Sequence, residues 1–479
     1  MIEKRDFYIG GEWVAPRAGQ DCEVIDPSTE EPCAVISLGG QADTDAAVAA
    51  AKAAFEGFAH SDPAERLVLL EKVIEVYKSR AEDLAQAMSL EMGAPIDMSR
   101  ASQVGAGVWN LENLARAQPE IGFDVPLGDH APEDRILREA VGVAALITPW
   151  NWPMNQVTLK VGAALLAGCP MVLKPSEIAP LSALIFAEIM HDAGVPAGVF
   201  NLVNGDGPGV GTQLSVHPDV DMVSFTGSTR AGILISKNAA DTLKRVHLEL
   251  GGKGANLIFA DADEKAVKRG ALHCFNNSGQ SCNAPTRMLV QRDAYDAAVE
   301  TAREVAEATR VGPASEAGRH IGPVVSAVQF DKIQALIQKG MDEGARLVAG
   351  GLGRPEGLNR GYFVRPTVFA DVNNDMTIAR EEIFGPVLSI IPFETEDEAV
   401  RIANDTVYGL TNYVQSEDGA RRNRLARRLR AGMVEMNGKS RGRGSPFGGM
   451  KQSGNGREAG AWGIEDFLEV KAVSGWAAE

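Results

Sequence analysis

The sequence predicts an α/β protein whose parallel sheet is covered by helices on both faces. Short apolar runs, typical of buried strands, lie at 141–148, 171–174, 199–203 and 222–226. Helical stretches lie between or after them at 154–167, 181–193 and 228–240. This alternation is typical of βαβ units, which build parallel sheets. Because 479 residues exceed one ordinary domain, we expect two large domains.

The remaining elements follow in chain order. Residues 43–58 and 63–92 have acidic starts, spaced apolar residues and many alanines, which predicts two amphipathic helices. The segment 118–140 is rich in Asp, Glu and Pro and interrupts the first α/β region. A second α/β region begins after Glu249 and runs to about residue 450.

Composition excludes several classes of protein. The net charge of −17 argues against nucleic acid as a partner, because phosphates would be repelled. No apolar run approaches the roughly 18 residues of a membrane span, and residues 1–6 lack the apolar centre of a signal peptide. The five cysteines form no C-x-x-C pair, so neither a metal site nor a disulfide framework is indicated. We therefore expect a cytoplasmic protein without membrane contact.

Two side chains indicate the chemistry. Cys282 lies among glycine and small polar residues, where an accessible thiolate could attack carbon. Glu249 is flanked by leucines and followed by two glycines, and partial burial would suit it to a general base by raising its pKa. Together they suggest covalent catalysis in two halves. Taken singly, Cys282 could be a small buried hydrophobe and Glu249 a solvated charge.

Six motifs elsewhere give these two residues a context. They lie at 148–153, 174–177, 225–229, 381–386, 446–449 and 453–458. In this order they resemble the aldehyde dehydrogenase superfamily, essentially from end to end. The resemblance implies a non-acylating, NAD(P)-dependent enzyme of a bacterial branch, with a Rossmann-type parallel-sheet cofactor domain, an α/β catalytic domain and an oligomerisation flap.

The resemblance also implies domain boundaries and subunit contacts. It places the NAD-binding domain at 1–117 and 141–248, the catalytic domain at 249–450, and the flap at 118–140 and 463–479. In the family these flap segments pair as strands and join subunits, which implies a homodimer or a homotetramer. The tail could instead be a simple terminal strand.

The cofactor must be held without the usual glycine-rich phosphate motif, because no G-x-G-x-x-G occurs. The nearest match, Gly454-x-Gly456-x-x-Ala459, follows no predicted strand, so we expect a surface loop there. Gly227 and Ser228 open a helix whose free N–H groups and dipole favour pyrophosphate. Ser228 could equally be an ordinary helix cap.

By resemblance, Lys174 and Glu177 hold the adenine ribose, and Glu382 holds the nicotinamide ribose with Phe384 near the ring. Glu177 would repel a 2′-phosphate, which favours NAD while leaving NADP possible. The remaining implied cofactor residues are Thr148, Pro149, Trp150, Ser176, Gly205, Gly209, Phe225, Thr226, Gly227, Ser228 and Leu250.

The implied reaction begins when Cys282 attacks an aldehyde, whose oxyanion would be stabilised by the Asn151 amide and the backbone N–H of Cys282. Hydride transfer leaves a thioester, and Glu249 activates the water that hydrolyses it. Relatives that release acyl-CoA generally lack this carboxylate, so a free acid is expected. Asn151 could instead cap the following helix.

Further site residues rest on the resemblance alone. Lys160 and Glu458 lie near the base, where they could pass its proton to solvent or form only a structural ion pair. The aldehyde pocket is implied at Trp109, Trp152, Asn155, Ser281, Asn283 and Phe447. Lys439, Arg441 and Arg443 lie in a glycine-rich loop at its mouth, where they could bind an anionic substrate or serve solubility.

Two rival functions remain open at this stage. A cysteine hydrolase would need a histidine partner, but none accompanies Cys282 in a recognisable pattern, and His273 lies in a helical stretch where we expect it to pack. A catalytically silent binding or structural protein is the second rival, since fold alone does not guarantee activity. The intact set of Cys282, Glu249 and Asn151 disfavours it.

Overall fold

The computed structural model describes residues 1–476 and contains four sheets. The first sheet has the order β12-β11-β8-β9-β10-β2-β3. Its strands are β12 (Arg245–Glu249), β11 (Met222–Thr226), β8 (Ala144–Ile147), β9 (Met171–Lys174), β10 (Phe200–Leu202), β2 (Phe7–Ile9) and β3 (Glu12–Val14). The first five run parallel, whereas β2 and β3 are added antiparallel at one edge.

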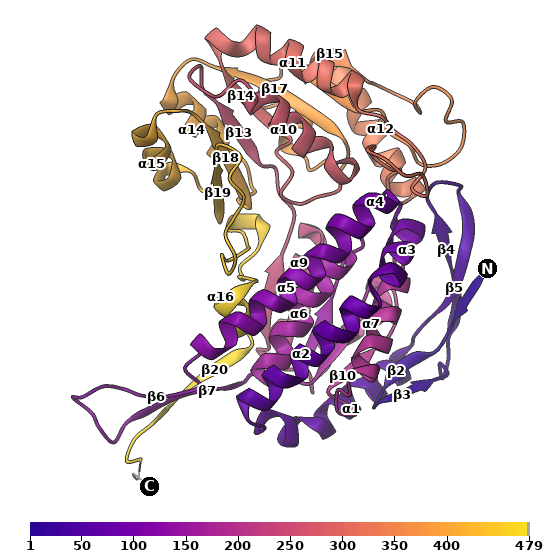
Figure 1. Cartoon of the computed structure of the whole chain (residues 1–479), viewed down its shortest axis with the longest axis vertical. Helices are drawn as coiled ribbons and strands as arrows, with labels where there is room; N and C mark the ends of the chain where they lie inside the picture. The colour runs from indigo at the N-terminus through magenta and orange to yellow at the C-terminus, as the bar shows by residue number, and fades with distance from the viewer. Residues whose placement is uncertain (477–479) are drawn as a thin grey trace.

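Helices cover both faces of the first sheet, as the sequence predicts (Figure 1). One face packs against α2 (Pro63–Ser79), α3 (Ala81–Met92), α5 (Val104–Ala117), α6 (Pro153–Ala167) and α7 (Leu181–Asp192). The other packs against α1 (Gln41–Ala59), α8 (Thr212–Val216) and α9 (Thr229–Ala239). Every residue of α6 except Asn155 is buried, so this helix lies inside the layer.

One helix boundary differs from the prediction. The stretch 63–92 is not a single helix, because α2 and α3 break at Arg80. No glycine or proline marks the break in the sequence. The Arg80 guanidinium instead binds Asp83 at 2.5 Å and Glu188 of α7 at 2.9 Å, a tertiary contact that local sequence does not reveal.

The second sheet has the order β15-β16-β17-β14-β13-β18-β19 and is parallel except at β15. Its strands are β15 (Arg346–Ala349), β16 (Thr367–Ala370), β17 (Val387–Phe393), β14 (Arg287–Gln291), β13 (Ala255–Ile258), β18 (Thr411–Gln415) and β19 (Met433–Met436). Two apolar clusters cover it, from helices α10 (Ala266–Phe275) and α11 (Tyr295–Ala308), and from α12 (Ala327–Asp342), α13 (Thr377–Arg380), α14 (Glu396–Asn404) and α15 (Gly419–Arg428).

A third sheet projects from the body of the molecule (Figure 1). It joins β20 (Leu468–Val473), β7 (Arg135–Ala140) and β6 (Asp124–Pro126), and β20 pairs antiparallel with β7 over six residues. The expected pairing of 118–140 with the tail is therefore present. The tail enters through helix α16 (Gly460–Glu465), so residues 463–465 are not strand, and residues 477–479 of the expected flap lie outside the described chain.

The fourth sheet, also three-stranded, lies near the N-terminus and has the order β1-β5-β4. It is formed by β1 (Ile2–Lys4), β5 (Glu31–Leu38) and β4 (Gln20–Asp26). The short helix α4 (Ile96–Met98) leads from α3 toward α5. Across residues 1–476, no helix combines the length and apolar character that crossing a bilayer requires.

Candidate active site

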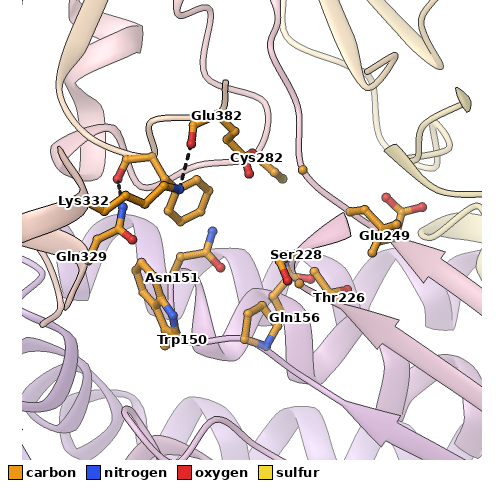
Figure 2. A pocket seen from close by; sticks show the side chains of 15 residues that line it. Trp150, Asn151, Gln156, Thr226, Ser228, Glu249, Cys282, Gln329, Lys332 and Glu382 are labelled. Atoms are coloured by element: carbon orange, nitrogen blue, oxygen red, sulfur yellow. Dashed lines mark hydrogen bonds between the residues drawn. The ribbon is translucent and has the colours of Figure 1, made fainter. Parts of the chain in front are cut away.

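A cavity of about 230 Å³ lies where the carboxyl ends of β8, β11 and β12 meet the second α/β region. Ligands of open parallel sheets bind beyond the carboxyl ends of the strands. Figure 2 shows Trp150, Asn151 and Gln156 on one side and Cys282, Glu382 and Lys332 on the other. The lining residues are Pro149, Trp150, Asn151, Gln156, Thr226, Gly227, Ser228, Glu249, Leu250, Gly251, Cys282, Gln329, Lys332, Glu382 and Phe384.

The loop before Cys282 has an unusual backbone that presents the thiol to the cavity. Asn277, Ser278 and Gly279 all have positive φ angles, of 52°, 56° and 74°. Positive φ angles at two non-glycine residues cost conformational energy, and such backbone strain tends to occur at functional sites. At Gly279 an added Cβ would lie 2.0 Å from the carbonyl oxygen of Gly385, so only glycine lets the loop pack there.

The Cys282 thiol is half-buried and has an acidic environment. Burial is the main reason that its pKa lies well above the ordinary value, and Glu382, Glu249 and Glu458 raise it further. This environment favours the thiol over the thiolate. Attack on carbon requires a base to take its proton, and Glu249 lines the same cavity.

Asn151 is tied to the cysteine loop by reciprocal amide hydrogen bonds. Its Nδ2 donates to the carbonyl oxygen of Gln280 at 3.0 Å, and Asn277 Nδ2 donates to the Asn151 carbonyl at 2.9 Å. An amide carries two N–H donors, so one of those on Asn151 remains for a ligand. These contacts explain the position of Asn151 and disfavour a role limited to capping α6.

Glu249 is the last residue of β12 and is only 2% exposed. Neither carboxylate oxygen has a hydrogen-bond partner among residues 1–476. Burial is the main reason that its pKa lies well above the ordinary value, and the charge of Glu458 adds to the effect, whereas Lys160 opposes it. A raised pKa increases the affinity of the carboxylate for protons, as the role of a general base requires.

Lys160 and Glu458 form a buried ion pair behind Glu249. Their side chains are 1% and 5% exposed, and Lys160 Nζ lies 2.7 Å from Glu458 Oε1. Lys160 also donates to Ser224 Oγ at 3.0 Å. The pair thus lies beside the base as expected, and its charge contributes to the pKa of Glu249.

Two glycines let the cysteine loop, Glu382 and β12 converge. An added Cβ at Gly252 would lie 2.3 Å from the carbonyl oxygen of Cys282, and one at Gly251 would lie 2.5 Å from Glu382 Oε2. The Gly252 N–H donates to Glu382 Oε1 at 2.8 Å. Burial raises the pKa of Glu382.

Helix α12 holds the segment that carries Glu382 and Phe384. Lys332 Nζ donates to the Glu382 carbonyl at 2.8 Å, and Gln329 Nε2 donates to the Phe384 carbonyl at 2.8 Å. Phe384 has a positive φ of 59° and meets Trp150 edge-on at 5.4 Å. Sequence reasoning did not identify Gln156, Gly251, Gln329 or Lys332, and Gln329 and Lys332 lie one helical turn apart on an ordinary amphipathic helix with no motif around them.

A second cavity of about 580 Å³ lies between the η3 turn (Gly207–Gly211), α8 and α9. Phe225 lies at its base, with the exposed apolar side chains of Ile233 and Leu234. Of the residues that line this cavity, Phe225 is the only one that the sequence pointed to. The exposed apolar residues of α9 were the available signal, because large apolar side chains on a solvent face often mark a binding surface.

Lys174 ends β9 beside this second cavity and is almost wholly buried. Its Nζ donates to the carbonyl oxygens of Gly205 at 2.5 Å and Pro175 at 2.8 Å and lies 3.4 Å from Glu177 Oε2. Burial lowers the pKa of Lys174. Gly209 donates its N–H to Asp206 Oδ1 at 2.6 Å, which shapes the η3 turn.

The other expected cofactor residues lie along the same sheet edge. The Thr148 N–H donates to the Lys174 carbonyl at 3.1 Å, and Ser176 Oγ accepts from the Ile178 N–H at 3.3 Å. Ser228 caps α9 by accepting from the Ala231 N–H at 3.3 Å, so its capping role is real.

The six expected substrate residues are not among those that line either cavity. Trp152 donates from Nε1 to Ser281 Oγ at 2.8 Å, and the Asn283 carbonyl accepts from Tyr413 at 2.6 Å. The remaining contacts are Asn110 to Asn155 Oδ1 at 3.0 Å and Arg441 over the Phe447 ring at 4.7 Å, while Trp109 lies on α5. One of these contacts, from Trp152 to Ser281, links an expected substrate residue to the cysteine loop.

The Gly454–Ala459 segment is not the surface loop that the sequence predicts. Gly454, Gly456 and Ala459 are all buried, and Gly454 bridges to Glu249. An added Cβ at Gly454 would lie 1.9 Å from the Leu248 carbonyl, so the glycine permits close packing on β12. His273 packs edge-on against Tyr413 at 5.3 Å, as expected.

Comparison with known proteins identifies the family. The model of the aldehyde dehydrogenase family matches residues 13–473, and the chain therefore belongs to this family. A curated relative, 3-succinoylsemialdehyde-pyridine dehydrogenase from a Pseudomonas species, is 51% identical, with 99% of each chain covered. The sequence-based assignment is confirmed.

Solved structures agree in fold. Aldehyde dehydrogenase from Bartonella henselae is 60% identical and superposes with a TM-score of 0.98, covering 99% of this chain and 100% of that one. A mutant of aldehyde dehydrogenase C from Pseudomonas syringae, complexed with NAD⁺ and octanal, is 48% identical with a TM-score of 0.97, covering 99% and 97%.

Proposed function

We propose that this protein oxidises an aldehyde to the free carboxylic acid with NAD. The observation that carries the proposal is the buried, unpartnered Glu249 carboxylate in one cavity with Cys282 and Asn151. A steady rise in the absorbance of the reduced cofactor, with stoichiometric acid as product, tests it. Release of acid without cofactor reduction would favour a cysteine hydrolase. No turnover at all would favour a catalytically silent protein.

The two cavities suit the two ends of NAD. The apolar cavity between η3, α8 and α9 suits adenine, and the Ser228 end of α9 offers free N–H groups toward phosphates. Glu382 has a carboxylate that can accept from ribose hydroxyls, and Phe384 lines the wall beside it. Relatives bind NAD⁺ in solved complexes. Bound NAD would accept the hydride.

In the proposed mechanism Glu249 first takes the Cys282 proton and passes it to solvent, which restores the carboxylate, and the resulting thiolate attacks the aldehyde carbon. The free N–H of the Asn151 amide stabilises the oxyanion. After hydride loss the acyl group is held as a thioester on Cys282. Glu249 then removes a proton from water, the hydroxyl adds to the acyl carbon, and the C–S bond breaks to return the thiolate.

We expect NAD to give a higher kcat/KM than NADP, because Glu177 would face a 2′-phosphate. Its side chain lies beside Lys174 at the sheet edge and is about one third exposed. Glu177→Gln should narrow the preference by roughly fivefold or more as the repulsion is removed. Steady-state kinetics with both cofactors measure the ratio. A wild-type preference for NADP would contradict the assignment of the ribose site.

We propose a neutral rather than an anionic aldehyde as the substrate. Arg441 Nε lies 3.4 Å from Glu435 Oε1, and the guanidinium stacks on Phe447, so its charge is already partnered. A relative named for a pyridine semialdehyde and another complexed with octanal are consistent with uncharged substrates. Of the three basic side chains in this loop, Lys439 and Arg443 remain as candidates to bind an anionic group.

The substrate proposal predicts that a neutral aldehyde exceeds a semialdehyde acid of equal length in kcat/KM. Arg441→Ala should slow both substrates alike, because it removes a wall of the pocket mouth. Arg443→Ala provides the comparison in the same loop. If either variant lost kcat/KM for the anionic substrate alone, the arginine concerned would bind a carboxylate.

The domain division also stays a proposal. Residues 1–117 and 141–248 would bind cofactor, 249–450 would carry the catalytic cysteine, and 118–140 with 463–479 would join subunits. The six-residue pairing of β20 with β7 supports the last assignment. Analytical ultracentrifugation should give a dimer or a tetramer. A cytoplasmic location is proposed on the composition.

A further inference from the structure

His247 lies beside the proposed general base and has no part in the mechanism above. It lies on β12 two residues before Glu249, and alternate residues of a strand point to the same face. Its Nε2 is 3.9 Å from Glu249 Oε1, and the residue is 3% exposed. A buried imidazole therefore faces a buried carboxylate.

The Asp466 carboxylate lies beside the imidazole, on the side away from Glu249 Oε1 that carries Nδ1. Its Oδ2 lies 2.6 Å from His247 Nδ1 and also accepts from the Arg457 N–H at 3.0 Å. Burial would raise the pKa of Asp466, but the His247 contact and the charge of Arg245 keep it below its ordinary value. In the tautomer with the proton on Nδ1, beside the Asp466 carboxylate, the lone pair of Nε2 is available to Glu249.

Gly456 provides the space for this ring. An added Cβ there would lie 2.3 Å from His247 Cε1, too close for any side chain. The tight turn at 454–456 thus packs one face of the imidazole, while Asp466, directly after α16, orients it. The sequence element that resembled a phosphate loop serves to hold His247 in place.

We propose that His247 is a positioning residue for Glu249 and accepts, through Nε2, the hydrogen bond of the carboxyl group that forms when Glu249 takes a proton. The inference rests on the proposed function. In the hydrolytic step water gives its proton to Glu249, its oxygen bonds to the acyl carbon, and the C–S electrons return to Cys282. His247 gains and loses no proton. Glu249 needs to move about 1 Å to close the contact.

The other charged groups near Glu249 are less suited than His247 to accept a hydrogen bond from its protonated carboxyl group. They are Glu458, Lys160, Arg457 and Asp466. Lys160 is engaged by Glu458 and Ser224, and Asp466 by His247. A cation would stabilise the carboxylate and weaken the base, whereas a neutral acceptor stabilises the protonated form and strengthens it.

The test compares His247→Leu, which removes the acceptor, with His247→Gln, whose amide oxygen can replace it. Quenched-flow samples analysed by intact mass follow formation and decay of the acyl-enzyme on Cys282. We expect His247→Leu to deacylate about 3- to 10-fold more slowly, because the carboxyl group formed in the hydrolytic step loses its acceptor. The acidic limb of its deacylation rate should shift to lower pH, and His247→Gln should restore most of the rate.

His217→Leu is the matched control, since that imidazole also faces a carboxylate, Asp45 at 3.4 Å, on the loop before β11. It should leave both steps unchanged. Normal deacylation in His247→Leu, or equal slowing in the Gln variant, would overturn the proposal. A wild-type protein that never forms an acyl-enzyme would instead overturn the proposed function, and this inference with it.

Discussion

Cys282→Ala is expected to abolish aldehyde oxidation while leaving NAD binding largely intact. The thiolate forms the covalent intermediate, and loss of a nucleophile costs at least about 10³-fold in related chemistry. The cofactor would be held instead by Lys174, Glu177 and Glu382. Cofactor reduction measures the activity, and isothermal titration with NAD measures the binding.

Cys22→Ala controls for the loss of a thiol, because Cys22 is also half-buried but lies on β4 in the N-terminal sheet. It should retain wild-type activity. If Cys282→Ala kept turnover within tenfold of wild type, the nucleophile would have to lie elsewhere.

The parallel-sheet region was predictable because its signals are local. The strands at 171–174 and 222–226 are short apolar runs, and Gly168 and Gly194 end or closely follow their helices. The break at Arg80 was not predictable, because it depends on Glu188, which lies far along the chain. Burial of Gly454 likewise depends on its approach to Leu248 and not on its own neighbours.

In the site, too, residues in local motifs were predictable, whereas residues that act through tertiary contacts were not. Glu249 and Cys282 lie in glycine-containing motifs that are visible in the sequence. The structure explains why glycine is required at 252, where the backbone approaches the Cys282 carbonyl. Lys332 and Gln329 act through side-chain contacts to backbone carbonyls, which leave no pattern in the sequence. His247 was invisible for a related reason: within β12 it reads as one polar residue in a strand, and only Asp466 gives it a direction.

Glu249→Gln should separate the two halves of the reaction. An amide cannot take a proton from water, so thioester hydrolysis should slow by about 10²- to 10⁴-fold. Where the thiolate forms without this base, hydride transfer should still occur once per site. A rapid-mixing trace should then show a burst of reduced cofactor followed by a very slow steady phase, with acyl-enzyme accumulating on Cys282.

The pH dependence and a chemical rescue complete this prediction. Burial raises the pKa of Glu249, and only the carboxylate form is a base, so wild-type hydrolysis should fall as pH drops through that raised value. The limb should vanish in Glu249→Gln. Hydroxylamine cleaves a thioester without needing a base, so it should restore turnover to the variant. An unchanged steady rate without a burst would contradict the role of Glu249. If the variant shows a burst but hydroxylamine does not restore its turnover, the slow step would lie after transfer of the acyl group.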